Sequence, residues 1–296
     1  MSVESQTERF VTVGDVELCY ETFGADDAPP LLLVMGLGSQ MIFWEDEFCG
    51  LLAAGGHRVI RFDNRDCGRS TIFRDNRPPT LRQLLLRDRR GTAYPLSALG
   101  DDAAGLLDQL GIDRCPVVGA SMGGMIVQLM AIDHPEKVSA LVSIMSTTGS
   151  RRVGNPTPRM LQRLLRRVRS DREGYIADTV ETLTAIGSRT YPPDPARLRG
   201  LAERAYDRGV HPAGTARQLA AINTTPNRTR RLAGVRVPST VIHGTEDPLI
   251  VPSGGRATAR AIPGARLLML DGMAHDLPRP LWPRIVEAIL QAATAA

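Results

Sequence analysis

A serine flanked by glycines is the first feature of this sequence that could do chemistry. The run Gly119-Ala120-Ser121-Met122-Gly123 follows an apolar stretch and opens a helical pattern. This context is typical of a strand that turns sharply into a helix and exposes the serine Oγ. Gly119 and Gly123 allow the strand and the helix to pack closely, and the amide of Met122 lies at the positive end of the helix. We therefore expect Ser121 to be a nucleophile and the Met122 N–H to stabilise an oxyanion.

A nucleophilic serine needs a base and a carboxylate that orients the base. His275 follows the last apolar run and precedes the C-terminal amphipathic pattern, which places it in a loop at the carboxyl edge of a sheet. Asp247 follows the preceding apolar run at the same predicted edge. Serine, aspartate and histidine then occur in a known chain order for a catalytic triad. We predict a triad of Ser121, Asp247 and His275, with Glu246 and Asp271 as alternative carboxylates.

A second glycine-rich turn could complete the site. Gly36-Leu37-Gly38 follows the apolar run 31–35, and its glycines allow close approach of the backbone. We expect the Leu37 amide to be the second oxyanion donor, and a plain glycine-rich turn is the alternative. Trp44 follows this turn and either lines a substrate pocket or packs in the core. His243 ends a strand, where we expect a packed polar group rather than the base.

A densely charged loop, residues 63–70, follows another strand at the same predicted edge. We expect it to be bonded internally and to brace the site. Cys67 within it has no obvious base beside it, so a reactive thiol is not expected. The four cysteines are scattered without a CxxC pair, which argues against a metal site or a disulfide framework. The sequence contains no phosphate loop or dinucleotide fingerprint, so no cofactor is implied.

Apolar runs alternate with helical patterns along most of the chain. A hairpin is predicted around Gly14-Asp15. The predicted strands are 11–13, 16–20, 31–35, 57–62, 115–119, 138–145, 237–243 and 265–270. This alternation predicts an α/β fold with a mostly parallel, eight-stranded sheet that is covered by helices on both faces.

The alternation stops between 147 and 232, where only helical patterns occur. We predict that 147–232 is a helical cap inserted into an α/β core made of 1–146 and 233–296. A second insertion, 72–96, contains the short basic amphipathic stretch 81–87. The leucines of this stretch either pack on the core or touch a lipid surface.

The composition indicates a globular protein and argues against a membrane-spanning one. The chain has 296 residues, of which 43% are hydrophobic and 23% are charged, as in globular proteins. No apolar run approaches the ~18 residues of a membrane span. The first eight residues lack the basic and apolar regions of a secretory signal, so we expect a cytoplasmic protein with no integral membrane segment. The sequence does not indicate an oligomeric state.

The charge is distributed unevenly. Residues 147–232 hold 17 arginines and 7 acidic residues, whereas the rest of the chain holds 19 basic and 25 acidic residues. We expect the arginines to lie on solvated helix faces and to steer anionic ligands as a secondary effect. Few aromatic residues are interleaved with them and no binding motif appears, so no nucleic-acid partner is expected.

Over its whole length the chain resembles the α/β-hydrolase superfamily. The features that carry the resemblance are the glycine-flanked Ser121, the Gly-x-x-Asp-Pro at Asp247 and the Gly-x-x-His at His275. Residues 34–38, the loop 63–70 and residues 119–124 further resemble two actinobacterial groups, the aclacinomycin methylesterase type and the mycobacterial lipase/esterase G type. The first type removes methyl esters from anthracycline polyketides.

The resemblance implies that Ser121 is the nucleophile, His275 the base and Asp247 the acid. It also implies an oxyanion hole made by the Leu37 and Met122 amides, and a helical cap over the site. The His-Gly that usually precedes the oxyanion loop is Met35-Gly36 here, a feature that the methylesterase type shares.

Together, these observations predict a serine carboxylic-ester hydrolase that works through an acyl-enzyme on a small to medium or polyketide-type ester. A lipid-surface esterase or lipase and a thioesterase are alternatives that use the same machinery, as do perhydrolases, haloperoxidases and C–C hydrolases. An alternative of another class is a regulatory protein that binds a small molecule on the same fold.

Overall fold

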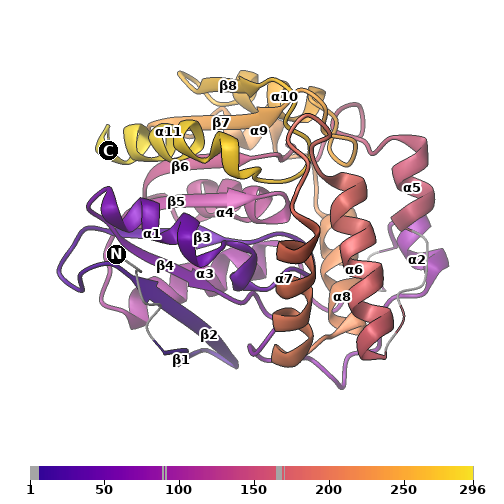
Figure 1. Cartoon of the computed structure of the whole chain (residues 1–296). Coiled ribbons are helices and arrows are strands. Elements are labelled where there is room, and N and C mark those ends of the chain that lie inside the picture. The colour runs from indigo at the N-terminus through magenta and orange to yellow at the C-terminus, as the bar shows by residue number, and fades with distance from the viewer. Residues whose placement is uncertain (1–6, 89, 91, 165–168, 170, 296) are drawn as a thin grey trace.

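The computed structural model describes residues 7–88, 90, 92–164, 169 and 171–295. Within these residues, eight strands form one sheet in the order β1-β2-β4-β3-β5-β6-β7-β8 (Figure 1). The strands are β1 (Arg9–Val13), β2 (Val16–Phe23), β3 (Pro30–Val34), β4 (Arg58–Phe62), β5 (Cys115–Ala120), β6 (Val138–Ile144), β7 (Ser239–Gly244) and β8 (Arg266–Leu270). The pairs β1–β2 and β2–β4 are antiparallel, and the other pairs are parallel. The carboxyl ends of β3 to β8 therefore meet at one edge.

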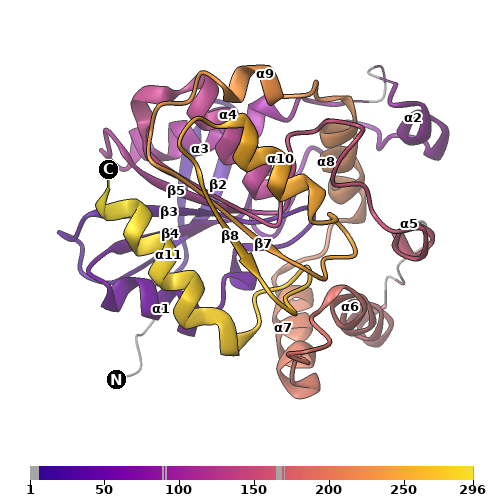
Figure 2. The ribbon, with the colours of Figure 1, turned by 90° about the horizontal axis from the view of Figure 1, so that it is seen from above.

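Helices cover both faces of this sheet, as the sequence predicts (Figure 2). One face carries α1 (Asp46–Ala54) and α11 (Trp282–Thr294), and the other carries α3 (Ser97–Gln109), α4 (Met122–Asp133) and α10 (Ser253–Ala261). Successive side chains of β3 enter opposite apolar clusters, with Leu32 in one cluster and Leu31 and Leu33 in the other. Burial on both faces explains why the central strands are continuous apolar runs. None of the described helices is long and apolar enough to cross a membrane.

The remaining short elements connect these layers. Between β4 and α3 lies α2 (Leu81–Leu86), and the 3-10 helices are η1 (Met41–Phe43), η3 (Pro135–Lys137) and η4 (Arg279–Leu281). The side chain of Thr80 caps α2 together with Gln83, and the left-handed Arg87 ends it. The Nδ2 of Asn223 donates to the Leu84 carbonyl at 3.4 Å, which ties α2 to the inserted helices. The side chain of Leu86 is 66% exposed.

The described residues between β6 and β7 form only helices, which we call the cap helices. They are α5 (Pro158–Leu164), α6 (Arg172–Ile186), α7 (Pro195–Arg208), α8 (Pro212–Thr224) and α9 (Thr229–Leu232). The Asp171 and Asp194 side chains cap α6 and α7, and prolines begin α7 and α8. Figure 1 shows α6, α7 and α8 beyond the carboxyl ends of the parallel strands.

The arginines of the cap helices are not simply solvated, contrary to the expectation from the sequence. Several of them form ion pairs with acidic residues of the α/β core, across the boundary between the two parts. These pairs are Arg197–Glu45, Arg204–Asp46, Arg208–Asp63, Arg217–Asp66 and Arg231–Asp133. The basic inserted segment and the acidic remainder of the chain are therefore complementary surfaces that attach to each other.

The Arg217–Asp66 pair is the most buried of these contacts. Arg217 Nε and Nη2 donate to Asp66 at 2.7 and 2.6 Å, and the Tyr94 hydroxyl donates to the same carboxylate at 2.7 Å. Burial alone would raise the pKa of Asp66, but the hydrogen bonds from Arg217 and Tyr94 outweigh it and lower that pKa. Both side chains are almost completely buried, so neither charge can turn to water if its partner is lost.

We predict that Arg217→Met lowers the free energy of unfolding by about 3–5 kcal/mol, because it leaves the Asp66 carboxylate buried without its counter-charge. The measurement is urea denaturation followed by circular dichroism. The control is Arg199→Met on α7, since half of the Arg199 side chain is exposed and its partners Glu173 and Glu203 are exposed and partly exposed, respectively. That change should cost no more than about 1 kcal/mol. Equal losses for the two variants would contradict the prediction.

Candidate active site

Ser121 lies at the sharp turn between β5 and α4. Its φ is 57° and its ψ is −116°, a conformation that residues with a Cβ rarely adopt. A Cβ on Gly119 would overlap the Gly123 carbonyl, and a Cβ on Gly123 would overlap the Val34 carbonyl. Both glycines are therefore required for α4 to pack against β5 and β3. The structure places this turn where the sequence predicts it.

The structure brings the three predicted triad residues into one hydrogen-bonded chain. Ser121 Oγ lies 3.0 Å from His275 Nε2, and His275 Nδ1 lies 2.7 Å from Asp247 Oδ2. His275 and Asp247 are buried, whereas Ser121 is partly exposed. This arrangement allows Ser121 Oγ to pass its proton to an imidazole whose other nitrogen donates to a carboxylate.

The environment of Asp247 keeps its carboxylate ionised. Its Oδ1 accepts from the amides of Leu249 and Ile250 at 2.9 and 2.8 Å. Burial alone would raise the pKa of Asp247, but the charge on His275 and the hydrogen bonds from His243 and His275 hold it well below its usual range. The alternative carboxylates, Glu246 and Asp271, are both exposed, and neither bonds to His275 among the described contacts.

His243 is a packed polar side chain, as the sequence predicts. It is fully buried, and its Nε2 lies 2.8 Å from the Ile250 carbonyl, to which it donates. The same nitrogen lies 3.4 Å from Asp247 Oδ2. His243 and His275 therefore both contact Oδ2 of Asp247, and the sequence pattern did not reveal the His243 contact.

The turn that contains Leu37 lies directly against Ser121. A Cβ on Gly36 would sit 3.1 Å from Ser121 Cβ and 3.6 Å from Ser121 Oγ. The Ser39 amide donates to the Gly36 carbonyl at 3.2 Å, which closes the turn. None of the hydrogen bonds found among the described residues uses the amide N–H of Leu37 or of Met122. Both predicted oxyanion donors therefore lie close to Ser121, without a hydrogen-bond partner among the described residues.

The sequence left two alternatives for Trp44, a wall of the substrate pocket or a residue of the core, and the structure places it in the core. Its side chain is fully buried and stacks on Phe48 of α1 with ring centroids 5.6 Å apart. The Trp44 carbonyl accepts a hydrogen bond from the buried Arg61 guanidinium. This placement favours the role of a core tryptophan over that of a pocket wall.

The loop 63–70 is bonded internally and braces its surroundings, as predicted. Asp63 accepts from the amides of Met41 and Arg69 at 2.7 and 3.0 Å. Asn64 Nδ2 donates to the Met35 carbonyl at 3.1 Å, next to the turn that holds Leu37. Burial raises the pKa of the Cys67 thiol well above its usual range, which agrees with an unreactive cysteine.

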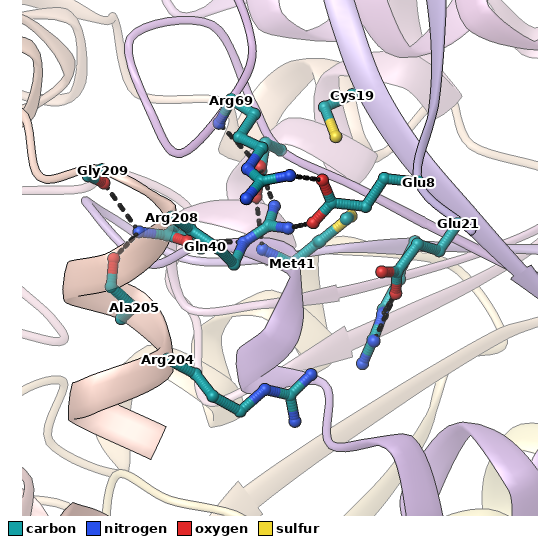
Figure 3. A network of polar contacts seen from close by, with 12 residues as sticks. Glu8, Cys19, Glu21, Gln40, Met41, Arg69, Arg204, Ala205, Arg208 and Gly209 are labelled. Atoms are coloured by element: carbon teal, nitrogen blue, oxygen red, sulfur yellow. Dashed lines mark hydrogen bonds and ion pairs between the residues drawn. The ribbon is translucent and has the colours of Figure 1, made fainter. Parts of the chain in front are cut away.

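The same region anchors the end of α7. Figure 3 shows Arg208 reaching from the last turn of α7 to Glu8, beside Gln40 and Arg69. Arg208 also pairs with the buried carboxylate of Asp63, and its Nε donates to Gln40 Oε1 at 2.8 Å. The segment just before β1, the loop 63–70 and the end of α7 are thus joined by one polar network.

The loop that carries His275 is also tied to the cap helices. The His275 amide donates to the carbonyl of Ile186, the last residue of α6, at 2.9 Å. Ser188 Oγ donates to Asp276 at 2.5 Å and accepts from the Ala274 amide at 2.8 Å. The sequence gave no signal for these contacts, because Ser188 and Asp276 are separated by 88 residues.

The family model for the alpha/beta hydrolase fold matches residues 29–278 of this chain. The chain belongs to that family. This α/β hydrolase is 29% identical to the rhodomycin D methylesterase DauP of Streptomyces sp. (strain C5), over 97% of this chain and 98% of the relative. It is 28% identical to a putative carbamate hydrolase RutD of Azorhizobium caulinodans, over 88% of this chain and 89% of the relative. These relatives support an esterase-type hydrolase.

Solved structures agree on the fold. The enol-lactonase from Burkholderia xenovorans LB400 superimposes with a TM-score of 0.75 over 97% of this chain and all of that chain, at 24% identity. A thermophilic esterase from Thermogutta terrifontis gives a TM-score of 0.70 over 97% of this chain at 21% identity.

We predict that Asp247→Asn lowers kcat about 10⁴-fold, because an amide facing Nδ1 favours the wrong imidazole tautomer. The measurement is steady-state turnover of an activated ester. Glu246→Gln, next to Asp247 but exposed, is the matched control and should leave kcat within about twofold of wild type, as surface changes usually do. A similar loss in both variants would argue against Asp247 as the partner of His275.

The lowered pKa of Asp247 also predicts how stability changes with pH. A carboxyl group that binds its proton more weakly when folded stabilises the native state above its unfolded pKa, about 4. That contribution is lost as the pH falls below this value. The difference in unfolding free energy between wild type and Asp247→Asn should therefore stay constant above about pH 5 and shrink as the pH falls from about 5 to about 2 in urea titrations. A constant difference would contradict the prediction.

Proposed function

We propose that this α/β hydrolase is a serine carboxylic-ester hydrolase with Ser121 as its nucleophile, His275 as its base and Asp247 as its acid. The observation that carries the proposal is the hydrogen-bonded chain of these three residues beside the amides of Leu37 and Met122. Nucleophile, base, orienting carboxylate and two oxyanion donors are the full set of groups that acyl transfer requires.

In the proposed reaction, His275 Nε2 takes the proton of Ser121 Oγ while Oγ bonds to the ester carbonyl carbon. The negative charge that develops on the carbonyl oxygen is held by the Leu37 and Met122 amides. His275 then gives its proton to the departing alkoxide, and the alcohol leaves behind an acyl-enzyme. Water then attacks the acyl carbon while His275 takes its proton, the bond from this carbon to Ser121 Oγ breaks, and His275 returns the proton to Oγ as the carboxylic acid is released. The ionised Asp247 stabilises the imidazolium at both stages.

We propose a polyketide-type ester with a small alcohol as the preferred substrate. The support comes from two rhodomycin D methylesterases, DauP and DnrP, which are 29% identical to this chain along almost their entire length. The cap helices would then form the wall that accommodates the bulky acid part, in a cap domain of residues 147–232 on a core of 1–146 and 233–296. The buried, unpaired state of all four cysteines is consistent with the proposed cytoplasmic location.

A second candidate function is hydrolysis of esters at a lipid surface. The observation that favours it is the 66% exposed side chain of Leu86 on α2, with Arg82 and Arg90 exposed nearby in the sequence. An exposed apolar side chain among arginines is suited to an anionic membrane surface.

We predict fast, Ser121-dependent turnover of esters with small alcohols, because methanol-sized leaving groups need little room beside His275. The assay measures hydrolysis of the methyl ester of a polycyclic aromatic acid, and p-nitrophenyl esters with acyl chains of two to sixteen carbons report how much room the site offers to the acid part. Ser121→Ala should lose at least about 10⁴-fold in kcat.

The same panel separates the alternatives. A preference for long acyl chains that increases with anionic vesicles would favour the lipid-surface candidate. Turnover that is unchanged in Ser121→Ala would refute the proposed mechanism. Turnover that is Ser121-dependent yet barely measurable on every ester would point to a ligand-binding regulatory protein.

A further inference from the structure

Helix α8 packs directly against the turn that holds the Leu37 amide. Thr215 and Gln218 lie three residues apart on α8, so both face the same side of the helix. A Cβ on Gly38 would sit 2.7 Å from Thr215 Oγ1. The Gly38 amide donates to Gln218 Oε1 at 2.9 Å. The turn is therefore enclosed between Ser121 on one side and a cap helix on the other.

The side chain of Gln218 is fixed at both ends. It is completely buried, and its Nε2 donates to the Arg65 carbonyl at 2.7 Å while Oε1 accepts from Gly38. The guanidinium of Arg65 is itself held by two 2.5 Å bonds to Asp102 of α3. The Gln218 amide thus connects the turn to a rigid part of the core, although it belongs to the inserted segment.

Helix α8 packs closely against the backbone next to Arg65. A Cβ on Gly214 would overlap the Asp66 carbonyl, and Arg217 pairs with the Asp66 side chain. Gly214, Arg217 and Gln218 lie on one face of α8, at the spacing of one helical turn. This face fixes the position of Gln218 relative to the turn.

The geometry of the turn explains what this contact controls. The Gly36 carbonyl accepts from the Ser39 amide, and in a trans peptide the following N–H, that of Leu37, points the opposite way. Gly38 has a left-handed φ of 62°, and glycine reaches conformations with negative φ about as readily, so its own backbone preference does not hold the turn. The hydrogen bond from the Gly38 N–H to Gln218 holds the Leu37–Gly38 peptide group in place. The neighbouring Gly36–Leu37 peptide group, which carries the Leu37 N–H, then cannot rotate together with it.

We propose that Gln218 is a positioning residue for the reaction and that α8 completes the oxyanion hole by fixing the turn that presents Leu37. The inference rests on the proposed function. It means that the Leu37 donor is oriented only while α8 is seated on the core, so the cap helices contribute to the rate of acyl transfer and not only to the shape of the pocket.

The test is Gln218→Met, which keeps the length of an unbranched side chain but has neither the acceptor for Gly38 nor the donor for Arg65. We expect kcat for a p-nitrophenyl ester to fall about 10- to 100-fold, somewhat less than for outright loss of an oxyanion donor, with KM within about threefold of wild type. Affinity for an aryl trifluoromethyl ketone, whose adduct with Ser121 carries an oxyanion, should fall by a similar factor.

Gln40→Met is the matched control. Gln40 is also a buried glutamine at the boundary with the cap helices, and its Nε2 donates to the Ala205 and Gly209 carbonyls at 2.7 and 2.8 Å. It makes no contact with the Gly38 amide among the described hydrogen bonds. Gln40→Met should lose stability as Gln218→Met does but keep the wild-type kcat and ketone affinity.

Hydrogen exchange provides a readout that does not depend on activity. The Gly38 amide should exchange slowly in wild type and in Gln40→Met, and fast in Gln218→Met. Rapid exchange in wild type would overturn the proposal, even if the Gln218 variant did not fold. So would an unchanged kcat in folded Gln218→Met, or equal losses of kcat in the two variants. Absence of Ser121-dependent turnover in wild type would instead refute the proposed function, while slow exchange at Gly38 would still report the contact.

Discussion

The close approach of three backbone segments around Ser121 is the constraint on which the rest of the structure depends. β5 enters the turn, α4 leaves it, and the segment after β3 lies beside it, with glycines at 119, 123 and 36 where a Cβ would collide or crowd its neighbour. A serine with a φ of 57° persists only where the surroundings hold it in place. Neighbouring strands provide that support, since the Ser121 amide donates to the carbonyl of Ile144 in β6 at 2.9 Å. The central parallel strands and the helices that bury them thus hold one strained residue in a partly exposed position.

Features encoded by neighbouring residues could be predicted from the sequence. The apolar strands, the hairpin at Gly14 and the helix that begins after Ser121 depend on local periodicity and on glycine, and the structure has them within a few residues of the predicted bounds. The residues at the carboxyl ends of β5 and β7 and after β8 follow from the same reasoning, because parallel strands bring those ends to one edge. This is why Ser121, Asp247 and His275 could be grouped although 154 residues separate the first from the last.

Contacts that depend on how the cap helices pack on the α/β core could not be predicted from the sequence. Gln218 and Gly38 are 180 residues apart, and nothing near either residue marks it as a partner of the other. The excess of arginine in 147–232 is visible in the sequence. Arginines that face solvent and arginines that pair with acidic residues of the core have the same spacing along a helix, so the sequence does not distinguish them. Only the fold shows that Arg208 and Arg217 meet the two aspartates of the loop 63–70. A buried tryptophan and a pocket tryptophan are equally indistinguishable by sequence, and Trp44 proved to be fully buried.

The nature of the boundary between cap helices and core has a mechanical consequence. Buried ion pairs add little net stability compared with apolar contacts, but each permits only one geometry, because a displaced partner leaves a charge without solvent or counter-ion. The pairs Arg217–Asp66 and Arg208–Asp63 therefore determine the position of α8 and α7 on the core. They contribute less to the free energy that holds these helices there. The loop that receives both arginines also bonds to the Met35 carbonyl through Asn64, immediately before the turn that contains Leu37. One charged loop thus sets the position of the cap helices and of the backbone beside Ser121. Side chains of α7 and α8 that lie outside this polar face can therefore change without moving the backbone beside Ser121.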